Sequence, residues 1–313
     1  MIAPQRPMTA REWGLLLLLS LLWGGSFFFV GVAVKTLPPF TIVAARVSIA
    51  ALLLWATAGL TGADPRAIVR EAPALALLGL LNNAAPFVLI VAGQTRIASG
   101  LAAILNAATP IFTVLIAHFV TTTERLTWRR AAGAALGLLG VVILMAGHGA
   151  LSQAPLWAEL AVLCAAAFYA CGSLYGRRFR ARGLAPIEVA TGQVTAAAIF
   201  LLPLAVGIDR PWLGPAPGWD ALAALFAIGA LSTALAYVIY FRILAGAGAT
   251  NVVLVTLLAP ATSILLGVAV LGERLEARHL LGFAVISAGL ALIDGRLPRV
   301  LSGAAGRLRV TRV

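Results

Sequence analysis

Two polar residues occupy equivalent positions before two prolines. Asn106 lies four residues before Pro110, and Thr256 lies four residues before Pro260. A proline in a helix has no N–H to offer the carbonyl four residues earlier, and in an apolar medium that carbonyl needs water, protein or a ligand. The pattern predicts two helix kinks, with a substrate or water site at Asn106 and Thr256. A kink satisfied by neighbouring helices alone is the alternative.

The offset of 150 residues between the prolines pairs further positions. It matches Asn82 with Ser232, Asn83 with Thr233, and Phe87 with Tyr237. Two adjacent asparagines are costly against lipid, so at least one should face a cavity or a partner helix. Phe87 and Tyr237 would add a flat apolar wall. We therefore predict substrate contacts at Asn82, Asn83, Phe87, Thr233 and Tyr237, with hydrogen bonding between helices as the alternative.

Aromatic residues match at a slightly different offset of 145, which pairs Trp23 with Phe168 and places Tyr169 next to it. Trp23 falls near the middle of its apolar run, away from the interfacial belt where tryptophan is commonest. Rings with a polar handle suit a pocket for an organic solute. Trp23 and Tyr169 therefore join the predicted substrate contacts, and ordinary packing is the alternative.

A few titratable residues stand at the ends of apolar runs. His118 could couple protons or act as a gate, although a hydrogen-bonded interfacial histidine is the favoured interpretation. Glu124 and Glu273 each precede an arginine at a helix end, where a carboxylate can cap the next helix or pair locally. We expect both glutamates to be structural.

Several kinds of chemistry find no support in the sequence. It has no Walker-type Gly-Lys-Ser/Thr loop, no His cluster and no Ser-His-Asp grouping. Cys164 and Cys171 are seven residues apart, a rise of about 10.5 Å on a helix, which is too far for a disulfide. We therefore expect no enzyme, no cofactor and no metal, and the near absence of acidic residues within the spans argues against a carboxylate relay.

The elements that carry these residues are apolar runs of helical length. The chain of 313 residues is 61% hydrophobic and 11% charged, whereas a soluble domain is near ~50% apolar and ~25% charged. Runs long enough to cross about 30 Å of hydrocarbon recur from end to end. The sequence predicts ten transmembrane helices, near 13–34, 40–60, 74–95, 98–120, 131–149, 157–176, 185–207, 219–241, 250–272 and 280–295.

The net charge of +12 does not indicate nucleic-acid binding, because the arginines fall in short connections between apolar runs. Seventeen arginines lie on the side of the termini, against five basic residues on the other side. Basic loops stay in the cytoplasm. We therefore expect both termini, including a basic tail at 296–313, to be cytoplasmic.

A long repeat organises the chain. The segment from Leu105 to Gly147 and the segment from Leu254 to Gly295 share a proline, then Glu-Arg-Leu, then an apolar run rich in small residues. With five spans in each copy, an odd number, the copies at 13–149 and 157–295 must enter the membrane from opposite sides. Such inverted pairs build alternating-access transporters with a midplane substrate site.

Glycines in the fifth span form a further pattern. Gly133 and Gly137 make a GxxxG face, which favours close helix packing within one chain or between the protomers of a homodimer.

These features together resemble the EamA-like drug/metabolite transporter superfamily. The resemblance is carried by the two five-helix halves, Glu124-Arg125-Leu126 and Glu273-Arg274-Leu275 after their prolines, Trp23-Gly24-Gly25-Ser26, and Arg46 in the second span. Thr123 in place of the usual glycine, and Phe168-Tyr169 where a tryptophan is common, depart from the pattern. The resemblance implies a ten-helix inner-membrane carrier with a cavity lined by spans 1, 3, 4, 6, 8 and 9.

Under that resemblance Arg46 lies outside the cavity, so structural anchoring is favoured over a contact with a substrate carboxylate. Gln193 in the seventh span is interpreted as helix packing. The sequence favours a secondary transporter that exports a small organic solute across the lipid bilayer. A membrane enzyme acting on a lipid or polyprenyl substrate, and a non-transporting sensor or scaffold, are the alternatives.

Overall fold

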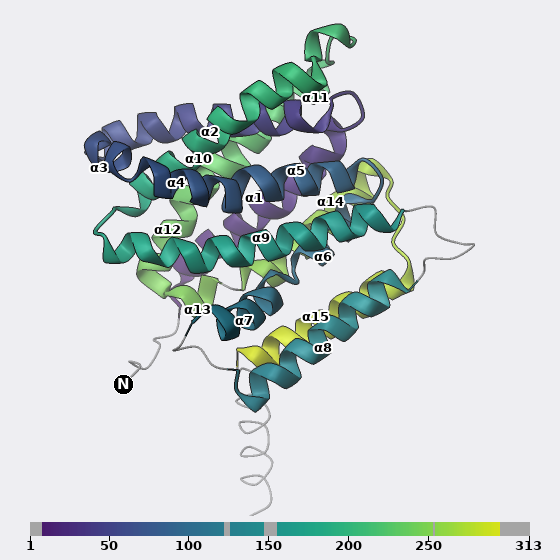
Figure 1. The fold of residues 1–313 in the computed structure, drawn as a ribbon. Coiled ribbons are helices and arrows are strands. Elements are labelled where there is room, and N and C mark those ends of the chain that lie inside the picture. Colours follow the sequence, from purple (N-terminus) through teal and green to yellow (C-terminus); the bar gives the residue numbers. More distant parts are fainter. Residues whose placement is uncertain (1–7, 122–125, 147–154, 253, 295–313) are drawn as a thin grey trace, which may run out of the picture.

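Residues 8–121, 126–146, 155–252 and 254–294 are described by a computed structural model, and every regular element in them is helical (Figure 1). Glu124, Thr123 and the basic tail fall outside these residues. In the first half the elements are α1 (Ala10–Ala33), α2 (Pro39–Leu60), α3 (Pro65–Arg70), α4 (Ala72–Gly79), the π-helical η1 (Leu80–Ala84), α5 (Ala85–Gln94), α6 (Ser99–Asn106), α7 (Thr109–Val120) and α8 (Trp128–Met145).

The second half repeats this order of helices. Its elements are α9 (Leu156–Ala181), α10 (Pro186–Leu204), η2 (Ala205–Asp209), η3 (Pro211–Leu213), α11 (Trp219–Phe226), the π-helical η4 (Ala227–Leu235), α12 (Ala236–Ala247), α13 (Ala249–Val252), α14 (Val255–Leu271) and α15 (Ala277–Ile293).

Eight helical stretches of the described chain are long and apolar enough to cross a membrane. They are Ala10–Ala33, Pro39–Leu60, Ala72–Gln94, Ser99–Val120, Trp128–Met145, Leu156–Ala181, Pro186–Leu213 and Trp219–Ala247. The remaining two expected spans, α14 and α15, are apolar helices of 17 residues each. At 1.5 Å per residue they reach about 25 Å, the lower limit for a membrane span. The prediction of ten spans is therefore supported for eight of them.

Local sequence explains where several helices begin and end. Glu12 Oε2 accepts a hydrogen bond from Thr9 N (2.8 Å), and Thr9 Oγ1 accepts one from Glu12 N (3.3 Å), which forms a capping box at the start of α1. Proline opens α2, α3 and α10, where its missing N–H costs nothing. Gly272, with φ of +67°, ends α14 in the left-handed conformation that favours glycine.

The two halves pack against each other through equivalent helices. α1 contacts α14 and the α11–η4–α12 stretch of the second half, while its counterpart α9 contacts α6, α7 and the α4–η1–α5 stretch of the first half. α2 lies beside α10, and α8 lies beside α15 as a separate pair at the lower right of Figure 1. The core is thus built from contacts between halves.

Carboxylates accept hydrogen bonds at both ends of the α2–α10 pair. Asp209 Oδ2 accepts hydrogen bonds from Thr41 N (2.6 Å) and Thr41 Oγ1 (2.9 Å), so it caps the start of α2 from η2, the segment that follows the end of α10. At the opposite end Glu188 Oε1 accepts from Asp64 N (2.9 Å). Since the start of each helix meets the end of the other, the two helices are antiparallel.

Glycines bring α8 and α15 into backbone contact. A Cβ added at Gly133 would lie 2.7 Å from Gly289 O, and one added at Gly140 would lie 2.8 Å from Gly282 O. The glycine face expected from Gly133 and Gly137 is therefore occupied within the chain, by the last helix of the other half.

Candidate functional site

The predicted polar residues of the third and eighth spans lie in π-helical segments. Asn82 and Asn83 belong to η1, and Ser232 and Thr233 belong to η4. Pro86 has no backbone N–H, so in η1 the Asn82 carbonyl lacks the hydrogen bond that it would accept in an α-helix. In η4 the Thr233 hydroxyl donates to Ile228 O, five residues earlier, at 2.9 Å. Single π turns often occur at functional sites, and here they occur at matching positions of both halves.

Tyr237 joins the two π-helical segments. Its hydroxyl accepts hydrogen bonds from Asn83 Nδ2 (3.1 Å) and Asn82 Nδ2 (3.4 Å), and Asn82 Nδ2 also donates to Gln193 Oε1 (3.2 Å). Asn83 is fully buried, and its Oδ1 has no hydrogen-bond partner among the described residues. The asparagines therefore face protein rather than lipid, and one buried acceptor remains open.

Arg46 reaches the same place from α2. Its Nε donates to Thr233 Oγ1 at 2.9 Å, and its guanidinium carbon lies 3.5 Å from the centre of the Phe87 ring. Only 7% of the residue is exposed. Arg46 thus links Phe87 of the first half to Thr233 of the second.

Aromatic rings extend the group on two sides. Tyr169 of α9 meets Phe87 edge-on with ring centroids 6.3 Å apart. Tyr237 stacks on Phe241 at 6.1 Å, and Phe241 meets Tyr240, whose ring lies 5.6 Å from Trp23 of α1. Among the contacts of the described residues, Trp23 is connected to the group through other rings. We call Arg46, Asn82, Asn83, Phe87, Tyr169, Gln193, Thr233 and Tyr237 the central cluster.

The two prolines differ in their surroundings. α6 ends at Asn106, Pro110 stands in the first turn of α7, and the Asn106 carbonyl accepts a hydrogen bond from Thr109 Oγ1 at 2.7 Å. Pro260 instead lies inside α14, whose second residue is Thr256. The carbonyl expected to be open at Asn106 is thus satisfied locally. Asn106 Oδ1 is buried without a partner among the described residues.

No hydrogen bond or ring contact in the described part of the chain joins Asn106 to the central cluster. His118 also lies apart from it. The histidine is exposed at the end of α7, where its Nδ1 accepts from Leu126 N at 3.2 Å and its ring meets Phe119. This position fits the favoured interpretation of a hydrogen-bonded histidine at a helix end.

Glu273 caps a helix of the other half. Its Oε1 accepts from Ser99 N (2.8 Å), and its Oε2 accepts from Ser99 Oγ (2.8 Å) and Gly100 N (3.3 Å). The sequence predicted that Glu273 caps the next helix or pairs locally, but the helix that it caps is α6 of the other half. A Cβ at Gly31 of α1 would lie 4.0 Å from the same carboxylate. We call these three hydrogen bonds the Glu273 cap.

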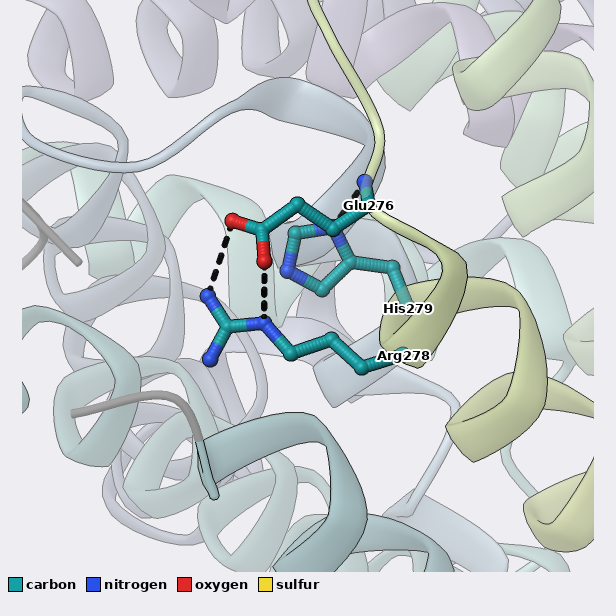
Figure 2. Close-up of polar contacts among 3 residues, drawn as sticks. All are labelled: Glu276, Arg278 and His279. Carbon is teal, nitrogen blue, oxygen red and sulfur yellow. Dashed lines mark hydrogen bonds and ion pairs between the residues drawn. The ribbon is translucent and has the colours of Figure 1, made fainter. Parts of the chain in front are cut away.

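A second polar group at the start of α15 is purely local (Figure 2). The Glu276 carboxylate faces the Arg278 guanidinium in a fork, with Nη2 to Oε1 at 3.0 Å and Nε to Oε2 at 2.8 Å, and Glu276 N donates to His279 Nδ1 at 3.1 Å. These contacts cap one helix. Among the described residues no group of three His, Cys, Asp or Glu side chains could hold a metal.

Two members of the central cluster were not among the substrate contacts predicted from the sequence. Arg46 was assigned to anchoring and Gln193 to helix packing. A signal existed for Arg46, because it is the one arginine in the interior of a predicted span, and an ionisable residue inside a membrane indicates function. Gln193 gave no comparable signal.

Comparison with known proteins places this geometry in context. The EamA-like transporter family matches residues 12–146 and again residues 156–294. The chain is 30% identical to "Uncharacterized inner membrane transporter YedA" of Escherichia coli (strain K12), over 90% of this chain and 89% of that protein. It is 29% identical to "Probable terminal-alkyne amino-acid exporter" of Streptantibioticus cattleyicolor, over 92% of this chain and 95% of that protein.

Two further matches agree with these. "Probable amino-acid metabolite efflux pump" of Salmonella typhimurium (strain LT2) is 27% identical over 90% of this chain and 94% of that protein. A protein of known crystal structure superposes with a TM-score of 0.65, covering 91% of this chain and 98% of its own, at 22% identity. At this level of identity, the match to the crystal structure shows that the two chains share a fold.

Proposed function

The chain belongs to the EamA-like transporter family and is a multi-pass inner-membrane transporter, and on that premise we propose that it exports a small organic solute by alternating access. The observation that carries the proposal is the central cluster, in which Tyr237 of the second half accepts hydrogen bonds from Asn82 and Asn83 of the first. Relatives named as amino-acid exporters or efflux pumps support the direction of transport.

The proposed architecture has ten spans arranged as two inverted five-helix repeats, with both termini in the cytoplasm. Two observations support it. The helices of one half contact the other half reciprocally, and π-helical segments recur at matching positions in the third and eighth spans. In inverted-repeat transporters the substrate site lies near the midplane between the repeats.

In this scheme the solute binds at the central cluster. Asn83 Oδ1 offers a buried acceptor, Phe87, Tyr169 and Tyr237 offer ring faces, and Thr233 positions Arg46. Trp23 borders the site through Tyr240. Asn106 and Thr256 belong to a second layer, at the end of α6 and the start of α14, where spans 4 and 9 can bend.

The Glu273 cap closes the outer end in this scheme. It ties the loop after α14, from the second half, to the start of α6, from the first half. α1 joins the same contact near Gly31. Opening the outer side would require the helices of the two halves to separate here, so these hydrogen bonds stabilise the outward-closed state.

The alternatives fit the observations less well. An enzyme acting on a lipid would need acidic or histidine residues clustered at one face, and the relatives are named as transporters. A sensor or scaffold would need no polar groups paired across the repeat. The central cluster contains several such groups.

Solute counterflow tests the proposal. Purified protein in liposomes preloaded with an unlabelled solute should concentrate the labelled form, and a screen would cover amino acids, aromatic metabolites and cationic dyes. Tyr237→Phe removes the acceptor of two hydrogen bonds, each worth ~1 kcal/mol, so counterflow of the transported solute should fall roughly thirtyfold.

The matched control is Tyr175→Phe, since Tyr175 packs on Phe179 and Arg178 away from the cluster. Its counterflow should stay within about twofold of the wild type, because the change keeps the ring and its packing on Phe179. An absence of counterflow for every solute, or equal losses in both variants, would contradict the proposal.

A further inference from the structure

Arg46 carries a positive charge deep in the bundle. The residue lies on α2 with 7% of its surface exposed. Burying a guanidinium away from water is costly unless hydrogen bonds and an opposite charge compensate. The cost is higher inside a membrane, where ionisable groups are retained mostly for function.

The protein compensates this charge only in part. Arg46 has five N–H donors, of which Nε–H is taken by Thr233 Oγ1. The face of Phe87 covers the guanidinium. Within the described part of the chain no Asp or Glu forms an ion pair with Arg46, and its electrostatic neighbours are the Tyr169 and Tyr237 hydroxyls. The site therefore holds one positive charge without a negative partner.

The contacts also fix the direction of the free donors. Stacking on Phe87 and bonding through Nε orient the guanidinium plane, so its remaining N–H groups form the fork that matches a carboxylate. The ring of Tyr169 meets Phe87 edge-on beside the guanidinium, so two aromatic rings adjoin the charge. One positive charge balances a monoanion, whereas a phosphate dianion would need further cations.

We propose that Arg46 is a specificity-determining residue that binds a carboxylate of the transported solute, with Phe87 and Tyr169 contacting the apolar part of the same molecule. This inference rests on the proposed function and narrows the solute to organic acids, including amino acids. Cationic solutes are rejected by the unpaired charge. The residue acts from α2, a helix that the resemblance places outside the cavity lining.

Pairs of acid and amide probes test the inference, since each pair differs only in the anionic group. Suitable probes are phenylacetate with phenylacetamide and L-phenylalanine with L-phenylalaninamide, measured both by counterflow and by the rise in unfolding temperature of the detergent-purified protein. The wild type should prefer each acid by at least about tenfold, because a charge-assisted hydrogen bond to a buried group is lost with the amide. In Arg46→Gln the acid and amide should become equal, and Arg46→Lys should retain part of the preference.

Arg242→Gln, which removes an exposed arginine of α12, is the matched control and should keep the wild-type preference. Equal handling of acid and amide by the wild type overturns the inference even if Arg46→Gln fails to fold, and leaves the proposed function intact. An unchanged preference in folded Arg46→Gln overturns it as well. Selective stabilisation of the wild type by acids without counterflow supports the inference and contradicts the proposed function.

Discussion

Replacing Glu273 with glutamine is expected to open the outer end of the transporter. The carboxylate accepts three hydrogen bonds from Ser99 and Gly100. The amide can accept with one oxygen only and turns an NH₂ group toward the remaining donors. A loss of about 2 kcal/mol would lower the ratio of outward-closed to outward-open protein roughly thirtyfold.

Hydrogen–deuterium exchange measured by mass spectrometry would detect this opening. Faster exchange is expected in the first turn of α6, and also at the end of α1 and the last turn of α14, because all three meet at Glu273. Glu276→Gln is the control, since Glu276 is bonded only within the start of α15 in the described contacts. Faster exchange confined to Ser99 and Gly100 would mean that the cap is local and does not close the outer end.

Enlarging Gly289 should have the largest effect on stability. A Cβ at this position would lie 2.6 Å from Gly133 O and 2.7 Å from Gly137 N, which are backbone atoms that cannot move aside like a side chain. Gly289→Leu should therefore separate α8 from α15 and destabilise the protein by about 3 kcal/mol or more. Size-exclusion chromatography after a series of heating steps would show a lower midpoint for loss of the monodisperse peak.

Gly14→Leu provides the comparison, because a Cβ at Gly14 of α1 would meet no atom within 4 Å. It changes the same residue type in another apolar helix and should leave the midpoint unchanged. Equal midpoints for the two variants would show that close contact between α8 and α15 is not needed for stability.

Apolar length and the repeat predicted most of the helix positions. The run at 40–60 became Pro39–Leu60, and the run at 98–120 became α6 and α7. These features are local, so periodicity and turn residues suffice to find them. The break between α6 and α7 lies directly before Pro110, as the proline predicts, whereas Pro260 lies inside α14 and the break in the second half, between α13 and α14, is further upstream. Proline alone therefore did not locate it.

The candidate site was predicted in part. Pairing the halves by the proline offset selected Asn82, Asn83, Phe87, Thr233 and Tyr237, and the structure brings these residues together. The placement of Arg46 depends on a contact with a residue 187 positions away in the sequence. The choice of the helix that Glu273 caps depends on a contact with a residue 174 positions away. No local pattern encodes such contacts. The π-helical form of η4 was also not predicted, because it depends on individual hydrogen bonds such as that from Thr233 to Ile228.

The central claim is that the central cluster binds solute on a pathway open alternately to the two sides of the membrane. Asn82→Cys, in a chain whose native Cys164 and Cys171 are replaced by alanine, tests it most directly with a membrane-impermeant thiol reagent applied to either side. Lys35→Cys and Arg180→Cys, at exposed positions on the proposed outer and inner sides, calibrate each side. The account predicts that the thiol of the Asn82→Cys variant reacts from both sides and that the transported solute slows both reactions. Reaction from neither side, or reaction unaffected by solute, would contradict it.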